Sequence, residues 1–195
     1  PLNVDFGSAS TSILDCYGDA DGVLDIDVTG GTGPYSYSWT TSNGTGLEPL
    51  REDQNDLTAG TYEVSVTDAN GCTITASFVI DEPEQLSASI DIAAPISCYG
   101  YSDGKLEAKY SGGTGPNYFY EWNDGAHQTT RIADGLHEGN YQVTVTDQNG
   151  CIATASRSIS QPDSIQIDNR ISYDVTCNGA GDGEMHLSAS GGTGT

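Results

Sequence analysis

The sequence Gly30-Gly31-Thr32-Gly33 occurs three times in this chain of 195 residues. Its second and third copies begin at Gly112 and Gly191, so the intervals between copies are 82 and 79 residues. The same two intervals separate equivalent cysteines and equivalent Asp-Gly pairs, which are Cys16, Cys98 and Cys177, and Asp21, Asp103 and Asp182. A fixed period of this length indicates tandem small domains. The chain therefore contains about two and a half copies of one unit.

A proline stands 15 residues before each equivalent cysteine, at Pro1, Pro83 and Pro162. We take these prolines as the starts of the units. This predicts a first repeat over residues 1–82, a second over 83–161 and a truncated third over 162–195. Each complete repeat is just large enough to form a hydrophobic core of its own.

Hydrophobic residues alternate with polar ones on both sides of each complete Gly-Gly-Thr-Gly sequence, as they do in half-buried β-strands. Before it stand Leu24, Ile26 and Val28 in the first repeat, and Leu106, Ala108 and Tyr110 in the second. After it stand Tyr35, Tyr37 and Trp39, matched by Tyr118, Tyr120 and Trp122. The second group predicts a strand that supplies much of the bulk of the core.

A later segment, Leu57-Thr58-Ala59-Gly60-Thr61-Tyr62, is typical of the tyrosine corner of an immunoglobulin-like sandwich. Residues 136–141 repeat its Leu-x-x-Gly-x-Tyr pattern, and Asn70-Gly71 and Asn149-Gly150 are strong hairpin signals. No segment combines helical periodicity with capping signals. We therefore predict an all-β protein made of tandem immunoglobulin-like β-sandwich repeats, with about seven strands per unit.

The charge of the chain restricts its partners. Six Lys and Arg residues stand against 28 Asp and Glu residues, which gives a formal net charge of −22. Phosphate binding needs clustered basic residues, so we expect neither nucleic acid nor an anionic membrane surface as a partner. No apolar run approaches the roughly 20 residues of a membrane helix, so we expect no membrane insertion. Calcium and cationic surfaces are compatible with this charge.

The five cysteines occupy equivalent positions in the repeats, which favours disulfides and an oxidising, extracytoplasmic compartment. One pairing lies within units, as Cys16–Cys72 and Cys98–Cys151, and leaves Cys177 unpaired. In an immunoglobulin topology, however, the two turns of one unit lie roughly 25 Å apart, whereas a disulfide spans a Cα separation of only about 4.4 to 6.8 Å. The other pairing is staggered, as Cys16–Cys151, and would join neighbouring repeats and stiffen a rod of domains. The sequence leaves both pairings open.

Three motifs in order resemble the SprB repeat over the whole chain: Cys-x-Gly-x-x-Asp-Gly, Gly-Gly-Thr-Gly-Pro-x-x-Tyr-x-Trp and Leu-x-x-Gly-x-Tyr-x-Val-x-Val-Thr-Asp-x-Asn-Gly-Cys. That family occurs in large surface adhesins of gliding Bacteroidetes. The resemblance implies an immunoglobulin-like or PKD-like stalk module, a bacterial cell-surface location, type IX secretion and a link to gliding motility. The second repeat departs from the first at Asn117, inserted after Pro116, and at Arg157, which replaces Phe78 and would expose part of the last strand.

No catalytic group keeps its position between repeats, because His127, His137 and His186 have no histidine counterparts. We therefore predict that the chain is not an enzyme. The Gly-Gly-Thr-Gly sequence lacks the Gly-Lys-Ser/Thr ending of a phosphate-binding loop. We interpret it as a turn in which glycine supplies positive φ angles.

Two weaker site hypotheses concern the cysteine turn. Calcium needs 6 to 8 oxygen ligands, and one carboxylate recurs in each turn, so we favour a plain Asp-Gly turn and no cofactor. The calcium candidates are Asp19, Asp21, Asp103 and Asp182. Exposed aromatic residues near the cysteines could instead stack on sugars, and the glycan-binding candidates are Tyr99 and Tyr101.

Together these patterns predict a structural or adhesive stalk segment of a large, repeat-built adhesin outside the cell. Its expected partners are further copies of the same repeat, with surface glycans or a substratum as ligands. A carbohydrate-binding module and an accessory domain of a secreted enzyme are the alternatives.

Overall fold

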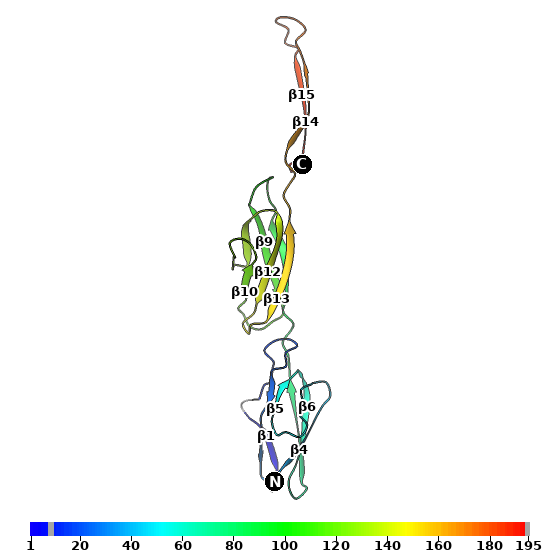
Figure 1. Ribbon diagram of the computed structural model, residues 1–195, viewed down its shortest axis with the longest axis vertical. Coiled ribbons are helices and arrows are strands. Elements are labelled where there is room, and N and C mark those ends of the chain that lie inside the picture. Colours follow the sequence, from blue (N-terminus) through cyan, green and yellow to red (C-terminus); the bar gives the residue numbers. More distant parts are fainter. Residues whose placement is uncertain (8–9, 194–195) are drawn as a thin grey trace. The chain divides into compact units, whose positions relative to one another are not determined.

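The computed structural model describes residues 1–7 and 10–193 (Figure 1). Every regular element in these ranges is a β-strand, so the all-β prediction is confirmed. The same ranges contain no helix with the length and hydropathy needed to cross a bilayer. The third Gly-Gly-Thr-Gly copy ends at Gly194 and the predicted third repeat at Thr195, and both residues lie outside the described ranges.

Within the described residues, the first repeat has seven strands: β1 (Asn3–Phe6), β2 (Gly22–Leu24), β3 (Ile26–Thr29), β4 (Ser36–Thr41), β5 (Gln54–Leu57), β6 (Gly60–Thr67) and β7 (Thr73–Ile80). The second has six: β8 (Ser87–Ala94), β9 (Gly104–Ser111), β10 (Phe119–Trp122), β11 (Ile132–Leu136), β12 (Gly139–Thr146) and β13 (Ile152–Ile159). The strands β14 (Gln166–Tyr173) and β15 (Glu184–Ser190) follow as an antiparallel pair.

The first repeat is a sandwich whose strand order follows from two sets of pairings. On one side β1 pairs with β3 and β2 pairs with β5, while β2 and β3 are separated only by Asp25. On the other side β4, β6 and β7 form a three-stranded sheet, in which Tyr37 lies opposite Val66. A single parallel bridge between Ile13 and Asp81 then connects the first segment of the chain to the end of β7.

The second repeat has the same strand order, β11-β9-β8 in one sheet and β10-β12-β13 in the other. These sheets correspond to strands A, B and E and to strands C, F and G of an immunoglobulin constant domain. The predicted immunoglobulin-like sandwich is thus confirmed by strand order. The described residues of this repeat hold one strand fewer because β9 runs unbroken where the first repeat has β2 and β3.

The tyrosine corner is present in both repeats. Tyr62 is fully buried, and its hydroxyl donates a hydrogen bond to the Thr58 carbonyl oxygen at 2.7 Å. The Tyr141 hydroxyl donates to the carbonyl oxygen of His137 at 3.1 Å. Trp39 is buried on β4 in the core of the first repeat, where its indole N–H donates to the Arg51 carbonyl oxygen. These bonds satisfy the polar ends of large core side chains.

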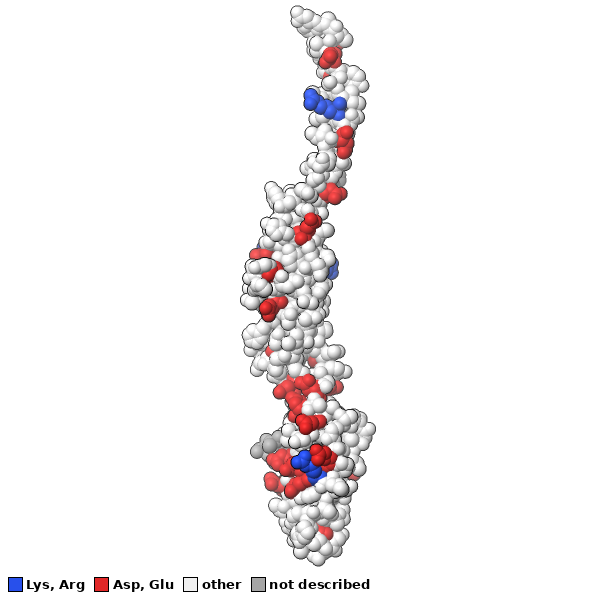
Figure 2. Space-filling view, in the orientation of Figure 1, with Lys and Arg blue, Asp and Glu red and all other residues white. Residues whose placement is uncertain are grey.

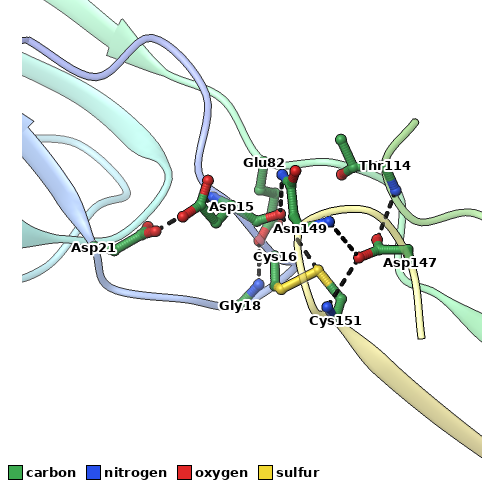
Figure 3. Close-up of a disulfide and its surroundings, with 9 residues drawn as sticks. All are labelled: Asp15, Cys16, Gly18, Asp21, Glu82, Thr114, Asp147, Asn149 and Cys151. Carbon is green, nitrogen blue, oxygen red and sulfur yellow. Dashed lines mark hydrogen bonds between the residues drawn. A yellow bond between two sulfur atoms is a disulfide. The ribbon is translucent and has the colours of Figure 1, made fainter. Parts of the chain in front are cut away.

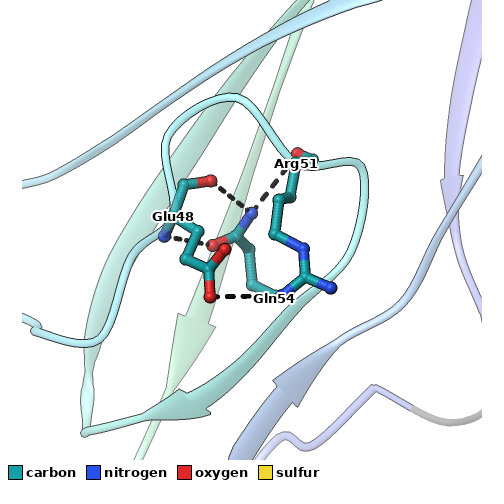
Figure 4. Close-up of polar contacts among 3 residues, drawn as sticks. All are labelled: Glu48, Arg51 and Gln54. Carbon is teal, nitrogen blue, oxygen red and sulfur yellow. Dashed lines mark hydrogen bonds and ion pairs between the residues drawn. The ribbon is translucent and has the colours of Figure 1, made fainter.

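In the first repeat, the loop from β4 to β5 is held by the amide of Gln54 (Figure 4). The amide nitrogen donates to the carbonyl oxygens of Glu48 at 3.0 Å and Arg51 at 3.3 Å, while its oxygen accepts the Glu48 N–H at 2.8 Å. Arg51 and Glu48 also form an ion pair of 3.1 Å. The buried Gln54 therefore adds three hydrogen bonds to a loop that also bonds to β4 through the Trp39 N–H and the Pro49 carbonyl oxygen.

The last strands of the two repeats differ as their sequences predict. Phe78 on β7 packs against Phe6, with ring centroids 4.7 Å apart. Its counterpart Arg157 on β13 is exposed and donates a hydrogen bond to the Ile90 carbonyl oxygen at 3.3 Å. A position that adds to the core in one repeat thus lies on the surface of the other.

The Cα positions divide the chain into two compact units, each of which combines separate segments. The first unit consists of Pro1–Ser87, Tyr110–Tyr118 and Thr146–Ala153, and the second of Ala88–Lys109, Phe119–Val145 and Thr154–Thr195. This division reflects which segments pack together, and it does not test the repeat boundaries inferred from the sequence. Those boundaries stay a prediction.

Candidate functional site

The cysteine turn is closed by its recurring aspartate. Asp103 accepts hydrogen bonds from the hydroxyl of Ser97 at 2.5 Å and from the N–H of Ser97 at 3.0 Å. The hydroxyl contributes most to holding the pKa of Asp103 below its ordinary value. Asp182 accepts the equivalent bonds from Thr176, which lower its pKa in the same way. In the first repeat Asp21 accepts a longer bond, 3.4 Å, from the N–H of Asp15.

These contacts give the carboxylates of three calcium candidates a structural role. The N–H of Asp19 donates to the Cys16 carbonyl oxygen at 3.3 Å, and the other three candidates carry the turn-closing carboxylates. In the part of the chain that the structure describes, no three His, Cys, Asp or Glu residues form a group that could hold a metal ion. Calcium binding by the turn stays a hypothesis that these contacts do not test.

The Asp-x-Asn-Gly-Cys turn is organised by its first residue. Asp68 Oδ1 accepts hydrogen bonds from the N–H groups of Asn70 and Cys72, each at 2.9 Å. Asp68 Oδ2 accepts a third bond from the N–H of Thr32 at 3.1 Å. The bond from Cys72 contributes most to holding the pKa of Asp68 below its ordinary value.

The partner Thr32 belongs to the Gly-Gly-Thr-Gly sequence, so this loop wraps around a carboxylate of its own repeat. Gly31 has a φ of 58°, and a Cβ there would lie 3.0 Å from Asp68 Oδ2. Glycine is therefore needed both for the backbone angle and for the close approach. The loop is a turn, as the sequence predicts, and the hydrogen bond to Asp68 is an addition that the sequence analysis missed.

The second repeat has the same arrangement around Asp147, which is only 2% exposed. Its carboxylate accepts the N–H groups of Thr114 at 2.7 Å and of Cys151 at 2.9 Å. The hydroxyl of Thr114 is buried without a hydrogen-bond partner among the described residues. The signal that could have revealed both aspartates is the fixed spacing Asp-x-Asn-Gly-Cys in the two repeats.

A disulfide joins Cys16 to Cys151, with a Cα separation of 5.7 Å (Figure 3). It connects the cysteine turn of the first repeat to the Asp-x-Asn-Gly-Cys turn of the second, and both turns belong to the first compact unit. The structure thus has the staggered pairing. The two within-unit pairings are absent, because Cys72 and Cys98 are free.

Polar contacts surround the bond on both sides (Figure 3). The side-chain amide of Asn149 donates to the Asp15 carbonyl oxygen at 3.1 Å, and the Cys151 sulfur lies 3.4 Å from the same oxygen. On the other side of Cys16, the N–H of Gly18 donates to the Glu82 carboxylate at 2.8 Å. The bonded cysteines are therefore held by hydrogen bonds as well as by the disulfide.

The within-unit pairing Cys16–Cys72 fails for a geometric reason. The N–H of Leu14 bonds to the Asp81 carbonyl oxygen at 2.9 Å, so the Cys16 turn lies beside the end of β7. Cys72 directly precedes the start of the same strand, which is eight residues long. Eight residues of strand span about 26 Å, far beyond the reach of a disulfide.

The two glycan-binding candidates are both on the surface. Tyr99 is 59% exposed and Tyr101 is 58% exposed. Their equivalents near the other cysteines, Tyr17 and Tyr173, are about as exposed. The structure therefore leaves aromatic rings accessible at each cysteine turn.

Acidic side chains outnumber basic ones on the face drawn in Figure 2. Several of the basic residues are moreover paired with acidic ones: Arg51 with Glu48, Lys105 with Asp134, and Lys109 and Arg131 with Glu107. These pairs are consistent with the prediction that the surface does not attract polyanions.

A family model described as the SprB repeat matches residues 8–44, 90–127 and 171–195. The three matched segments together make up about half of the chain, and one falls in each predicted repeat. No curated protein matches the chain.

Solved structures of similar fold include three multidomain proteins. A C-terminal 282-residue fragment of intimin, in complex with the intimin-binding domain of its translocated receptor, is 15% identical, with a TM-score of 0.43, 86% of this chain covered and 66% of that one. The eight N-terminal immunoglobulin domains of Down syndrome cell adhesion molecule are 16% identical, with a TM-score of 0.35. The match covers 88% of this chain and 25% of that one. The mouse nectin-like molecule 4 ectodomain is 13% identical, with a TM-score of 0.32. The match covers 82% of this chain and 63% of that one. The chain spans less than two thirds of each protein, and these scores carry no functional argument.

Proposed function

Because the chain belongs to the SprB repeat family, we propose that it is a structural and adhesive stalk segment of a large, repeat-built adhesin on a bacterial cell surface. Its partners in this proposal are further copies of the same repeat. Gliding motility is the process it would serve, and type IX secretion is the route by which it would reach the surface. Family membership and the immunoglobulin-like fold support the proposal.

The observation that carries the proposal is the Cys16–Cys151 disulfide. Tension applied on either side of the bond passes through it, because the bond is the shortest covalent path between the two flanking segments. The enclosed chain, which corresponds to a sequence separation of 135 residues, then bears no load. It would otherwise contribute roughly 450–490 Å of extensible length. A stalk with such bonds resists extension even when its domains unfold.

We further propose that the role is mechanical and not catalytic. The surface charge supports this role, since a net charge of −22 keeps copies of the repeat soluble and opposes their sticking to one another. Extracellular conditions are required, because a structural disulfide persists in an oxidising compartment.

Cell attachment under shear tests the proposal. Cells that display this chain within its adhesin should be labelled by antibodies without permeabilisation and should detach at lower shear when Cys16 is replaced by serine. Asp27→Asn is the control, because Asp27 is exposed on β3 and takes no part in a disulfide. Labelling only after lysis, or equal detachment of the two variants, would contradict the proposal.

A second candidate function, glycan binding, is favoured by the exposed rings of Tyr99 and Tyr101. Aromatic faces at this exposure could stack on sugar rings, as the sequence analysis predicts. A glycan array should then show binding that disappears when both are changed to alanine. Phe119→Ala provides the control, since Phe119 is an exposed aromatic residue on β10 and is not part of a cysteine turn. An array without a signal for the unmodified chain would eliminate this candidate.

A further inference from the structure

The turn around the free cysteine Cys98 is built like the turn around the bonded cysteine Cys16. The Cys98 carbonyl oxygen accepts the N–H of Tyr101 at 3.2 Å, as that of Cys16 accepts the N–H of Asp19 at 3.3 Å. The N–H of Gly100 donates to the Gln161 side chain at 2.5 Å, just as Gly18 donates to Glu82. Cys98 is therefore presented in the arrangement that forms a disulfide elsewhere in the same chain.

A hollow adjoins each of these two turns, and the linings correspond. Beside Cys16 the lining includes Tyr17, Gln85 and Leu86, and the bonded turn supplies Cys151 and Ile152. Beside Cys98 a hollow of about 280 Å³ is lined by the equivalent residues Tyr99, Ser164 and Ile165. Each hollow lies within one compact unit. The second hollow is thus placed where an Asp-x-Asn-Gly-Cys turn lies in the first.

The β14–β15 hairpin presents the face on which such a turn would be built. Ile165 next to β14 is 74% exposed and Leu187 on β15 is 60% exposed. Their equivalents in the second repeat, Leu86 and Ala108, are buried in a complete sandwich. The hairpin therefore has the pattern of strands A and B with their core face uncovered, and strands C, E, F and G would cover it.

We propose that Cys98 forms a second inter-repeat disulfide, with the cysteine of an Asp-x-Asn-Gly-Cys turn from the strands that complete the β14–β15 hairpin. The amide of the incoming asparagine would donate to the Ser97 carbonyl oxygen, because Ser97 is equivalent to Asp15. This inference rests on the proposed stalk function. It implies that the cysteine turn of each stalk repeat is bonded to the Asp-x-Asn-Gly-Cys turn of the repeat that follows.

The chemistry requires a small-molecule disulfide such as glutathione disulfide as the oxidant. The Cys98 thiolate attacks it, forms a mixed disulfide and releases one glutathione thiol. The incoming cysteine thiolate then attacks the Cys98 sulfur, and the second glutathione thiol leaves. Two protein thiols are oxidised and one glutathione disulfide is reduced to two thiols.

Overlapping bonds of this kind would give a stalk two load lines, meaning two parallel covalent paths along which tension is carried. In one line the tension would cross Cys16–Cys151 and follow the backbone to Cys177, which lies 26 residues further on. The other line would run through Cys98. Part of the chain enclosed by the Cys16–Cys151 bond would then carry the second line.

The test adds a copy of strands β10 to β13 to the whole chain. A copy of residues 117–161 is attached after Thr195, and the protein is oxidised in a glutathione buffer and mapped by non-reducing peptide analysis. We expect Cys98 to be bonded to the copied Cys151, so that alkylation of Cys98 is lost while Cys72 and Cys177 remain labelled. Cys98→Ser should leave the copied cysteine labelled.

A bond from the copied cysteine to Cys177, or a free Cys98, overturns the inference. The proposed function stands in that case if the Cys16–Cys151 bond is still found, and it fails separately if that bond is absent. Hydrogen exchange monitors the added segment. If this segment stays unprotected, the inference is also overturned, because it requires these strands to complete the hairpin.

Discussion

Asp68 holds together two turns that are far apart in the sequence of the first repeat. It accepts N–H groups from Asn70 and Cys72 in its own turn and from Thr32 in the glycine-rich loop. A carboxylate that accepts several backbone hydrogen bonds is stabilised in its ionised form. The folded state therefore favours the charged Asp68 more than the unfolded state does.

This difference predicts an acid-dependent stability. The pKa of Asp68 is lowered from 3.8 in the folded state, so its contribution is fully present above about pH 4 and is lost as the pH falls through the folded pKa. Asp68→Asn should lower the Tm by several degrees at pH 6 and flatten the dependence of Tm on pH below 4.

Asp27→Asn on the exposed side of β3 is the control for this measurement. It should leave the Tm profile between pH 2 and pH 6 close to that of the unmodified chain. Parallel profiles for Asp68→Asn and the unmodified chain would show that Asp68 makes no such contribution.

Replacing the tyrosine of each corner by phenylalanine should lower the unfolding free energy by unequal amounts. Tyr62→Phe removes a buried hydroxyl and leaves the Thr58 and Thr45 carbonyl oxygens without this donor. The expected cost is about 1 kcal/mol of unfolding free energy. Tyr141→Phe should cost less, because Tyr141 is only partly buried and water can replace its bond to His137. Urea denaturation measures both, and an equal or larger loss for Tyr141→Phe would contradict this account.

Among strands and turns, local patterns predicted most of what the structure contains. The alternation of Leu24, Ile26 and Val28 predicted a strand, and the structure has it, but with a break at Asp25 that separates β2 from β3. The corner at Tyr62 was predicted because its pattern is local in the sequence. Such elements depend on neighbouring residues, and so the sequence alone is enough to identify them.

Contacts between distant segments were harder to predict. The bond from Thr32 to Asp68 spans 36 residues. Each residue belongs to a repeated motif, but no pattern in the sequence indicates that the two motifs meet. The choice between Cys72 and Cys151 as the partner of Cys16 depended on whether the first strand crosses the whole domain before the Cys16 turn. The Ile13–Asp81 bridge answers this by bringing the cysteine turn to the end of β7.

For the whole chain, the consequence of the staggered bond is a loop of covalent structure that spans most of two predicted repeats. Its sequence separation of 135 residues leaves only the flanking segments in the path of a stretching force. This property depends on covalent connectivity alone. It is the physical basis of the proposed stalk function.

Single-molecule force spectroscopy tests this claim most directly, with the chain held at its two termini. With the bond intact, complete unfolding should release only the segments outside Cys16 and Cys151. Reduction, or Cys16→Ser, should add roughly 450–490 Å of contour length, whereas Cys72→Ser should add none under oxidising conditions. An equal contour length for the oxidised and the reduced chain would contradict the account.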